Sequence, residues 1–181
     1  MIHIEVTEGP DTRPLASKIE PVYAEVYAEP PYHEGPDDVA GFLEWYDASV
    51  GQQRVRVVTA YENDELVGFA LGYPLRPGTS WWTRLLDSLP PDFDTTETGT
   101  RTLALIELAV RKPWRRQGIG RRLHDAFLDV PDAERATLTV RPEPEAAPAR
   151  DAYRKWGWRK ISRKQPQADG PIYDLMVKDL V

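Results

Sequence analysis

The chain has 181 residues and a mass of 20.6 kDa, which suits one compact domain with its own core. With 41% hydrophobic and 29% charged residues and no cysteine, the composition is that of a soluble globular protein and excludes disulfides, thiolate metal sites and a cysteine nucleophile. The net charge is −6, no apolar run approaches the roughly 20 residues that span a bilayer, and no signal peptide is visible, so we expect a cytoplasmic protein.

The first fifty residues predict a strand and two helices. Residues 2–6 alternate as in a short strand, and residues 19–27 carry apolar side chains at helical spacing before Pro30-Pro31 ends that helix. Asp37 or Asp38 is a candidate N-cap for a second helix. The expected inner face of this second helix is apolar and consists of Val39, Phe42, Leu43 and Tyr46.

A hairpin and a long irregular segment follow. Residues 55–59 and 66–73 are typical of two strands, with a turn over 62–65. Residues 74–100 are rich in proline and glycine. A loop of this length can be a lid or binding loop, a flap that covers core, or a dimer contact. We favour the two structural roles, the flap and the dimer contact. Within it, large side chains recur at helical spacing and predict a short helical stripe: Trp81, Trp82, Leu85, Leu86 and Leu89. The two tryptophans suggest a homodimer.

The remaining residues alternate strand and helix patterns. The expected strands are 103–110, 136–140, 158–161 and 172–177, and the expected helices are 119–127 and 146–156. The order of elements becomes βααββ, then βα, βα and ββ. We therefore predict a single α/β (α+β) domain over residues 1–181, with a mixed sheet of about six to seven strands and about four helices.

One segment concentrates glycine and positive charge where a strand, a turn and a helix meet. It reads Arg115-Arg116-Gln117-Gly118-Ile119-Gly120-Arg121. Residues 111–122 hold six Lys and Arg and no acid. Glycines let a ligand approach the backbone, and the first N–H groups of a helix favour an anion. The spacing fits neither a Walker loop nor a dinucleotide fingerprint, and an arginine-rich helix start that only aids solubility is the alternative.

Two motifs make the chain resemble a known family. Leu105 to Val110, then Pro113, then Arg115-x-x-Gly118-x-Gly120, resembles the acyl-CoA signature of the GNAT superfamily of N-acetyltransferases. Downstream, Ala149-x-x-x-Tyr153-x-x-x-Gly157-Trp158 is similar to the second GNAT element, although Ala146 replaces the usual asparagine. The resemblance covers about residues 55–178 and implies a GNAT-like fold with a splayed central sheet, and transfer of an acetyl group from acetyl-CoA to a primary amine.

The resemblance also implies roles for individual residues in holding the co-substrate. The N–H groups of Gln117, Gly118, Ile119 and Gly120 would cradle the pyrophosphate, with Arg115 and Arg116 nearby. Arg121 or Arg122 would reach the 3′-phosphate. The backbone of Leu108, Ala109 and Val110 would pair with pantetheine like an added strand. No metal is expected, because the three histidines are too scattered to suggest a site.

Proton transfer is assigned to two residues. Tyr153 matches the family tyrosine that acts as general acid toward the departing thiolate, with a packed core tyrosine as the alternative. Glu107 is a carboxylate inside an apolar strand, where an unpaired charge is costly, so we expect it to face a cleft and act as base. The alternatives are an ion pair with an arginine, or a water relay in place of a base.

Charge predicts the kind of acceptor. Residues 1–100 sum to −12, and residues 101–181 sum to +6. We expect the acidic half to build the acceptor side and attract a cationic amine, and the basic half to hold CoA. Tyr32, His33 and Glu34 follow the first helix and are candidate acceptor contacts, through cation–π and charge interactions, with loop solvation as the alternative.

Two other functional classes compete with an enzyme. A GNAT-like fold can serve as a non-catalytic acyl-CoA sensor or scaffold, which would bind the cofactor without turnover. Nucleic-acid binding through the arginine-rich helix start is disfavoured by the acidic balance and by the absence of a reading motif. We therefore expect an amine acceptor as partner, with neither nucleic acid nor membrane.

Overall fold

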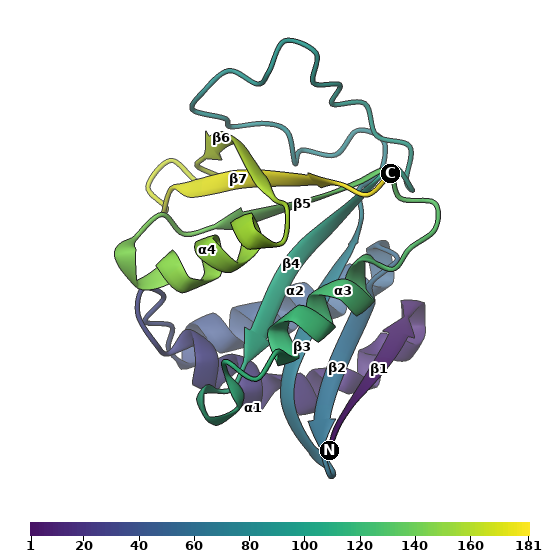
Figure 1. Ribbon diagram of the computed structural model, residues 1–181, viewed down its shortest axis with the longest axis vertical. Coiled ribbons are helices and arrows are strands. Elements are labelled where there is room, and N and C mark those ends of the chain that lie inside the picture. Colours follow the sequence, from purple (N-terminus) through teal and green to yellow (C-terminus); the bar gives the residue numbers. More distant parts are fainter. The chain divides into compact units, whose positions relative to one another are not determined.

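The computed structural model describes the whole chain, which forms two compact units. The first combines Met1–Tyr73 with Leu105–Val130, and the second combines Pro74–Ala104 with Pro131–Val181. Strand β4 (Thr102–Val110) runs from the second unit into the first (Figure 1). Each unit therefore contains residues from both of the oppositely charged halves of the sequence.

The first unit contains three antiparallel strands and three α-helices. Its elements are β1 (Ile2–Glu8), the 3-10 helix η1 (Gly9–Leu15), α1 (Ala16–Tyr27), α2 (Pro36–Gln52), β2 (Arg56–Glu62), β3 (Glu65–Pro74), the end of β4, the 3-10 helix η2 (Lys112–Trp114) and α3 (Ile119–Leu128). In the β2–β3 hairpin Glu62 pairs with Glu65, and Asn63 in the turn is left-handed with φ of 55°. Asparagine adopts that conformation readily, which confirms the turn predicted here.

Helices cover both faces of these strands, with α1 and α2 on one face and α3 on the other (Figure 1). Alternation along β3 decides which side chain meets which helix. Phe69 and Leu71 join the buried aromatic and aliphatic side chains of α1 and α2. Gly68, which precedes Phe69 and points to the opposite side, faces α3, because a Cβ there would lie 3.2 Å from Leu123. The three helices predicted from periodicity in this unit are all present.

The start of α2 corrects one prediction. Its N-cap is Gly35, not Asp37 or Asp38. The Asp38 carboxylate instead accepts a hydrogen bond of 2.8 Å from the backbone N–H of Gly35. That contact is the N3 half of a capping box, and it places negative charge at the positive end of the helix dipole.

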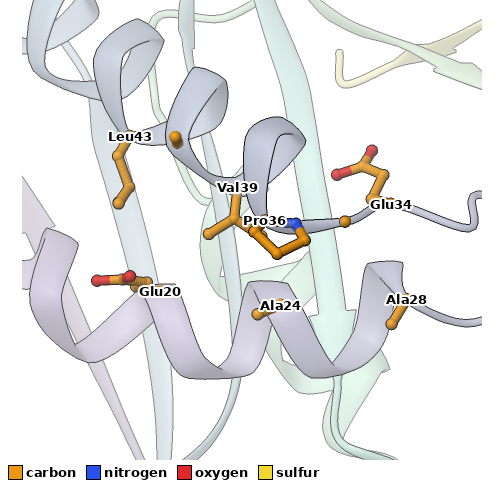
Figure 2. Close-up of a pocket in the computed structure, with 9 residues that line it drawn as sticks. Glu20, Ala24, Ala28, Glu34, Pro36, Val39 and Leu43 are labelled. Atoms are coloured by element: carbon orange, nitrogen blue, oxygen red, sulfur yellow. The ribbon is translucent and has the colours of Figure 1, made fainter.

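The outward faces of α1 and α2 leave a groove between the two helices (Figure 2). Phe42 and Tyr46 are buried in the core, as expected of the inner face of α2. Val39 and Leu43 are only half-buried, and they line the groove as well as contacting the core. The apolar stripe of α2 is therefore wide enough to contact the core on one side and to line the groove on the other.

The second unit contains the remaining strands and α4. Its elements are the start of β4, β5 (Arg135–Val140), the 3-10 helix η3 (Pro144–Ala146), α4 (Ala147–Lys155), β6 (Arg159–Lys164) and β7 (Tyr173–Asp179). Strand β5 pairs in parallel with Thr102–Ala104 of β4 and antiparallel with β7, which pairs antiparallel with β6. Gly157 ends the helical region at φ of 90°, a conformation that favours glycine.

Together the strands form a mixed seven-stranded sheet in the order β1-β2-β3-β4-β5-β7-β6. Seven strands and four α-helices confirm the predicted α/β fold class and its order of elements. None of the helices is both long and apolar enough to cross a membrane.

The segment 74–100 forms no helix, so the predicted helical stripe is wrong. Several of its large residues contact other parts of the second unit instead. Trp81 donates from Nε1 to Oγ1 of Thr137 on β5 at 3.0 Å, and Leu85 forms an isolated β-bridge with Lys164. Trp82 is buried. Both indoles are thus used inside the unit, and the dimer that they suggested stays a prediction.

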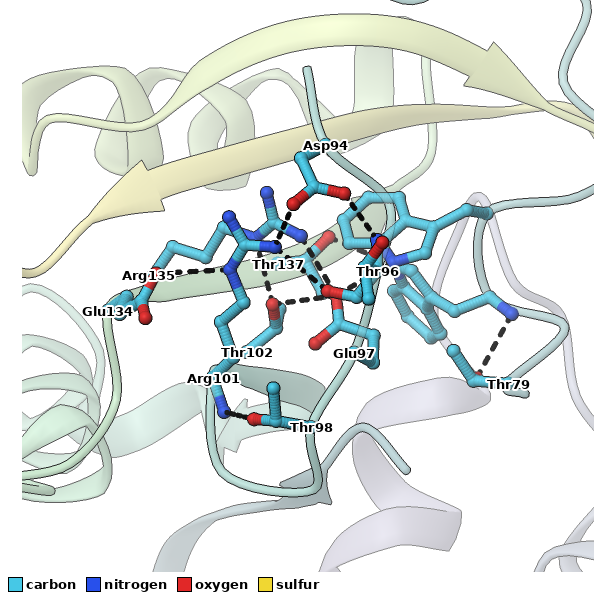
Figure 3. A network of polar contacts seen from close by, with 12 residues as sticks. Thr79, Asp94, Thr96, Glu97, Thr98, Arg101, Thr102, Glu134, Arg135 and Thr137 are labelled. Atoms are coloured by element: carbon cyan, nitrogen blue, oxygen red, sulfur yellow. Dashed lines mark hydrogen bonds and ion pairs between the residues drawn. The ribbon is translucent and has the colours of Figure 1, made fainter. Parts of the chain in front are cut away.

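A buried ion pair holds this segment to β5 (Figure 3). Arg135 and Glu97 are joined at 2.9 Å, and their side chains are 9% and 1% exposed. Thr102 bridges the two charges, donating to Glu97 at 2.8 Å and accepting from Arg135 at 2.8 Å. The guanidinium also lies over the rings of Trp82 and Phe93. These contacts support the interpretation of the segment as a flap that covers core.

Replacing Glu97 with alanine should strongly destabilise the protein. The change leaves the Arg135 charge buried without its counter-ion, and breaking such a pair costs about 3–5 kcal/mol. We expect a loss of that size in the free energy of unfolding, measured by urea denaturation. Glu134→Ala is the matched control, because Glu134 pairs with Arg101 but is 59% exposed, so its loss should cost less than about 1 kcal/mol. Equal losses in the two variants would contradict the prediction.

Candidate functional site

The glycine-rich turn that precedes α3 is built to receive an anion. Gly118 is the N-cap of α3, with φ of 78°, and no side chain caps the helix. Arg116, two residues earlier, is also left-handed, with φ of 62°. The first N–H groups of an uncapped helix have no intrahelical partner, and the positive end of the helix dipole lies at the same place.

The space around this turn fits a group that contacts the backbone. A Cβ added to Gly118 would meet no protein atom within 4 Å. The residues predicted as a cradle are Gln117, Gly118, Ile119 and Gly120. Gln117 and Gly118 are exposed, Gly120 is half-buried, and the Ile119 side chain is buried in the unit. A phosphate at the turn would therefore meet backbone N–H groups without displacing a core side chain.

Ion pairs already engage several of the basic residues around the turn. Arg111 bonds to Glu25 and Glu65, Arg115 bonds to Glu29 at 2.7 and 2.9 Å, and Arg121 bonds to Asp125. Arg122 donates to the carbonyl of Ile2 at 3.1 Å. Lys112 and Arg116 form no ion pair and are exposed, so they are the cations at this turn that are open to an anion.

The end of β4 offers backbone groups next to the turn. The ladder with β5 uses only Thr102–Ala104, so Leu108, Ala109 and Val110 lie beyond it. The Val110 carbonyl accepts from Nε of Arg115 at 2.8 Å, and a Cβ on Gly68 would lie 2.8 Å from the Ala109 carbonyl. The absence of a side chain at Gly68 is thus what lets β3 approach this part of β4.

Glu107 lies on the α1 side of β4. Its carboxylate accepts a hydrogen bond from the hydroxyl of Tyr27, and the side chain is half-buried. Burial raises the pKa of Glu107 to about 8, against the smaller lowering by the Tyr27 hydrogen bond. The sequence left open an ion pair between Glu107 and an arginine. The structure contains no such ion pair. A carboxyl group with a pKa near neutrality is suited to accept a proton.

A second carboxylate belongs to the same cluster. Glu34 accepts a hydrogen bond of 2.6 Å from the hydroxyl of Tyr23, and burial raises its pKa. The charge of Glu34 also contributes to the raised pKa of Glu107. The rings of Tyr23 and Tyr27 lie 4.5 Å apart, so two tyrosines and two carboxylates form one continuous group.

Sequence reasoning missed Tyr23 and Tyr27 as site residues. They were predicted only as part of the apolar face of the first helix, a role that they also fill, since both are buried. The available signal was their hydroxyl groups, because a buried tyrosine needs a hydrogen-bond partner. That partner is 80 positions away in one case, beyond any local pattern.

The other predicted acceptor contacts lie at the end of α1 but differ in environment. Tyr32 is half-buried, and its ring packs edge-on against Tyr27 at 4.9 Å. His33 is exposed, with φ of 50°, and is not part of the tyrosine–carboxylate cluster. Of the three predicted residues, Tyr32 and Glu34 are thus brought together with Glu107.

Tyr153 lies on α4 in the second unit. It is half-buried, and its ring contacts Trp156 and Trp158 edge-on, with centroids 5.8 and 5.9 Å away. These contacts set the orientation of the ring. Trp158 is buried.

Comparison with known proteins places the chain in a family. The sequence profile of the Acetyltransferase (GNAT) family matches residues 18–158. No protein of curated function matches the sequence. The match spans both units and includes the glycine-rich turn, Glu107 and Tyr153.

Solved structures share the fold at low sequence identity. A GNAT-family protein from Desulfovibrio desulfuricans has 15% identity and a TM-score of 0.68 with both chains fully covered. The ribosomal-protein-S18-alanine N-acetyltransferase of Escherichia coli has 18% identity and a TM-score of 0.62, over 99% of this chain and 94% of that one. The PaiA N-acetyltransferase of Thermoplasma acidophilum, solved with coenzyme A, has 12% identity and a TM-score of 0.58, over 98% and 99%. These structures show the shared fold, and the profile match over residues 18–158 shows that the chain belongs to the GNAT acetyltransferase family.

Proposed function

We propose that the protein is an N-acetyltransferase that moves the acetyl group of acetyl-CoA to a primary amine in a ternary complex. The observation that carries this proposal is the uncapped start of α3, where left-handed Gly118 opens onto free space. The same segment holds Lys112 and Arg116, which are exposed and form no ion pair. The turn suits the pyrophosphate of CoA, and the family match supports the acyl donor.

Glu107 is the proposed base. A primary amine is protonated near neutral pH, so one proton must leave before the nitrogen can attack the thioester carbonyl. Glu107 has a pKa of about 8 and can take that proton when it is ionised. Tyr27 stays a hydrogen-bond donor to it throughout, because burial and the charge of Glu107 raise the pKa of Tyr27 well above its ordinary value.

Tyr153 is the proposed acid. When the new C–N bond forms and the C–S bond breaks, the departing sulfur takes a proton, for which the Tyr153 hydroxyl is the candidate donor by resemblance to the family. A backbone N–H among Leu108, Ala109 and Val110 is the candidate donor to the carbonyl oxygen as negative charge builds there. A protein that only senses acyl-CoA would need neither Tyr153 nor Glu107.

Gly118→Glu should abolish most of the affinity for acetyl-CoA. The new carboxylate would occupy the open space at the turn and repel the pyrophosphate, so we expect at least about tenfold weaker binding, or about 1.4 kcal/mol, by calorimetric titration. Gly9→Glu is the control, since Gly9 is also left-handed with open space around its Cβ. If both variants weaken binding alike, or neither does, the cradle is not at Gly118.

The rate should rise with pH through the pKa of Glu107. The base works only when ionised, so kcat/KM should increase as pH passes about 8 and level off above it. Glu107→Gln should lower kcat by about 100-fold and remove this limb of the profile. A limb that persists unchanged in Glu107→Gln would assign it to another group, such as the acceptor amine.

Tyr27→Phe should move that limb to higher pH. The Tyr27 hydrogen bond lowers the pKa of Glu107, so its loss raises the kinetic midpoint above about 8. Tyr46→Phe is the matched control, because Tyr46 is also buried in the aromatic core but donates to the Thr12 carbonyl at 2.6 Å. A shift of equal size in the control would show that the effect comes from altered packing.

Tyr153→Phe should slow the chemical step while leaving donor binding intact. The ring and its contacts with Trp156 and Trp158 remain, and only the hydroxyl is lost. We expect kcat to fall by about 100-fold, with the calorimetric affinity for acetyl-CoA within about twofold of the original. Unchanged turnover would refute the role of Tyr153, and binding without turnover in the unmodified protein would favour the sensor alternative.

A further inference from the structure

The groove between α1 and α2 has a volume of about 470 Å³ and lies wholly within the first unit. Two kinds of side chain line it. Small or apolar residues make up most of the lining, and two glutamates are its only charged members. The lining residues are Glu20, Ala24, Ala28, Glu34, Gly35, Pro36, Val39, Ala40 and Leu43.

The groove exists because α1 presents small residues at helical spacing. Glu20, Ala24 and Ala28 follow one another at intervals of four and so share one face, while the buried side chains of α1 lie toward the sheet. The alanines leave room opposite Val39 and Leu43 of α2 (Figure 2). An aliphatic chain can lie in this space and remove apolar surface from water.

The two carboxylates stand at opposite ends of the groove. Figure 2 shows Glu20 near Leu43 at one end, and Glu34 with Ala28 at the other. Glu20 and Ala28 are eight positions apart on one helix, which corresponds to about 12 Å at 1.5 Å per residue. A ligand that meets both carboxylates must therefore be long and must carry a cation at each end.

No basic side chain of the protein neutralises these ends. The segment 16–52 carries eight acidic residues and only one basic residue, Lys18. The two acids Glu25 and Glu29 are paired with arginines, whereas Glu20 has no ion-pair partner and Glu34 bonds only to Tyr23. The negative potential of the groove is therefore available to a ligand.

The Glu34 end of the groove is the end nearest the proposed base. Tyr23 donates to Glu34, and the ring of Tyr23 lies 4.5 Å from that of Tyr27, which donates to Glu107. After burial, the charge of Glu34 is a further cause of the raised pKa of Glu107. A cation bound at Glu34 is thus close to the carboxylate that would take its proton.

We propose that the acceptor is an extended aliphatic diamine or polyamine that lies in this groove, with one ammonium at Glu20 and the amine to be acetylated at the Glu34 end. The inference rests on the proposed acetyltransferase function and specifies its substrate class. At about 1.2 Å per bond of an extended chain, a span of about 12 Å corresponds to about ten bonds between the two nitrogens.

The test compares linear α,ω-diaminoalkanes of about four to about twelve carbons with monoamines of equal length, using acetyl-CoA as donor. We expect kcat/KM to be highest for diamines near ten bonds between nitrogens, and higher for these diamines than for the matching monoamines. Glu20→Gln should reduce the diamine-to-monoamine ratio of kcat/KM by about fivefold, or about 1 kcal/mol. Glu44→Gln is the control, because it makes the same charge change on α2 outside the lining and should leave the ratio as it is.

Ala24→Phe gives a second, steric test, since the larger ring fills the middle of the groove. It should weaken diamine binding by at least about tenfold in calorimetric titration, with the far-ultraviolet circular dichroism spectrum confirming the fold. No dependence on chain length, a ratio unchanged in Glu20→Gln, or a preference for peptides with apolar N-termini over every diamine would each overturn the inference. Diamine binding that depends on Glu20 without any acetyl transfer would overturn the proposed function and support the groove as a diamine site.

Discussion

Burial of one carboxylate between a strand and an aromatic helix face is the constraint on which the first unit depends. Glu107 is a charged residue within the apolar strand β4. Tyr27 of α1 donates a hydrogen bond to its carboxylate, which a leucine at that position could not do. The same burial that costs folding energy raises the pKa of Glu107 toward neutrality. The Glu107 carboxylate, which would only destabilise an ordinary core, thus has the pKa near neutrality that a base requires.

Ion pairs divide the basic residues of the signature segment into two roles. Arg111 and Arg115 bond to Glu25 and Glu29, and so tie α1 to the end of β4 and the turn before α3. Lys112 and Arg116 remain exposed without such partners. The composition alone suggested that the whole arginine cluster binds a ligand. Ion pairs within the protein account for much of that cluster instead. This pairing also leaves Glu20 on α1 and Glu34 in the loop before α2, neither of which has an ion-pair partner, to define a negative groove.

In the second unit, buried polar and aromatic contacts hold the long proline-rich segment 74–100 in place. The segment contributes Glu97 and two tryptophans, and β5 contributes Arg135 and Thr137. Charge, hydrogen bonds and aromatic faces meet at a single buried arginine, which secures a stretch without regular structure. Tyr153 lies in this unit on the short helix α4, and its ring is held by Trp156 and Trp158, which follow the end of that helix.

The order of strands and helices, the hairpin turn and the glycine-rich helix start could be predicted from the sequence, because periodicity, turn chemistry and helix termini are local properties. Local spacing failed where distant partners decide conformation, as at Trp81, which bonds to Thr137 rather than forming a helix. It also misplaced the N-cap of α2, since aspartate serves equally at the cap and at N3. The partnership of Tyr27 with Glu107 and the groove between α1 and α2 were decided only by tertiary structure. Hydrogen bonds and cavities depend on which surfaces meet in space, and no pattern along one helix specifies its neighbour.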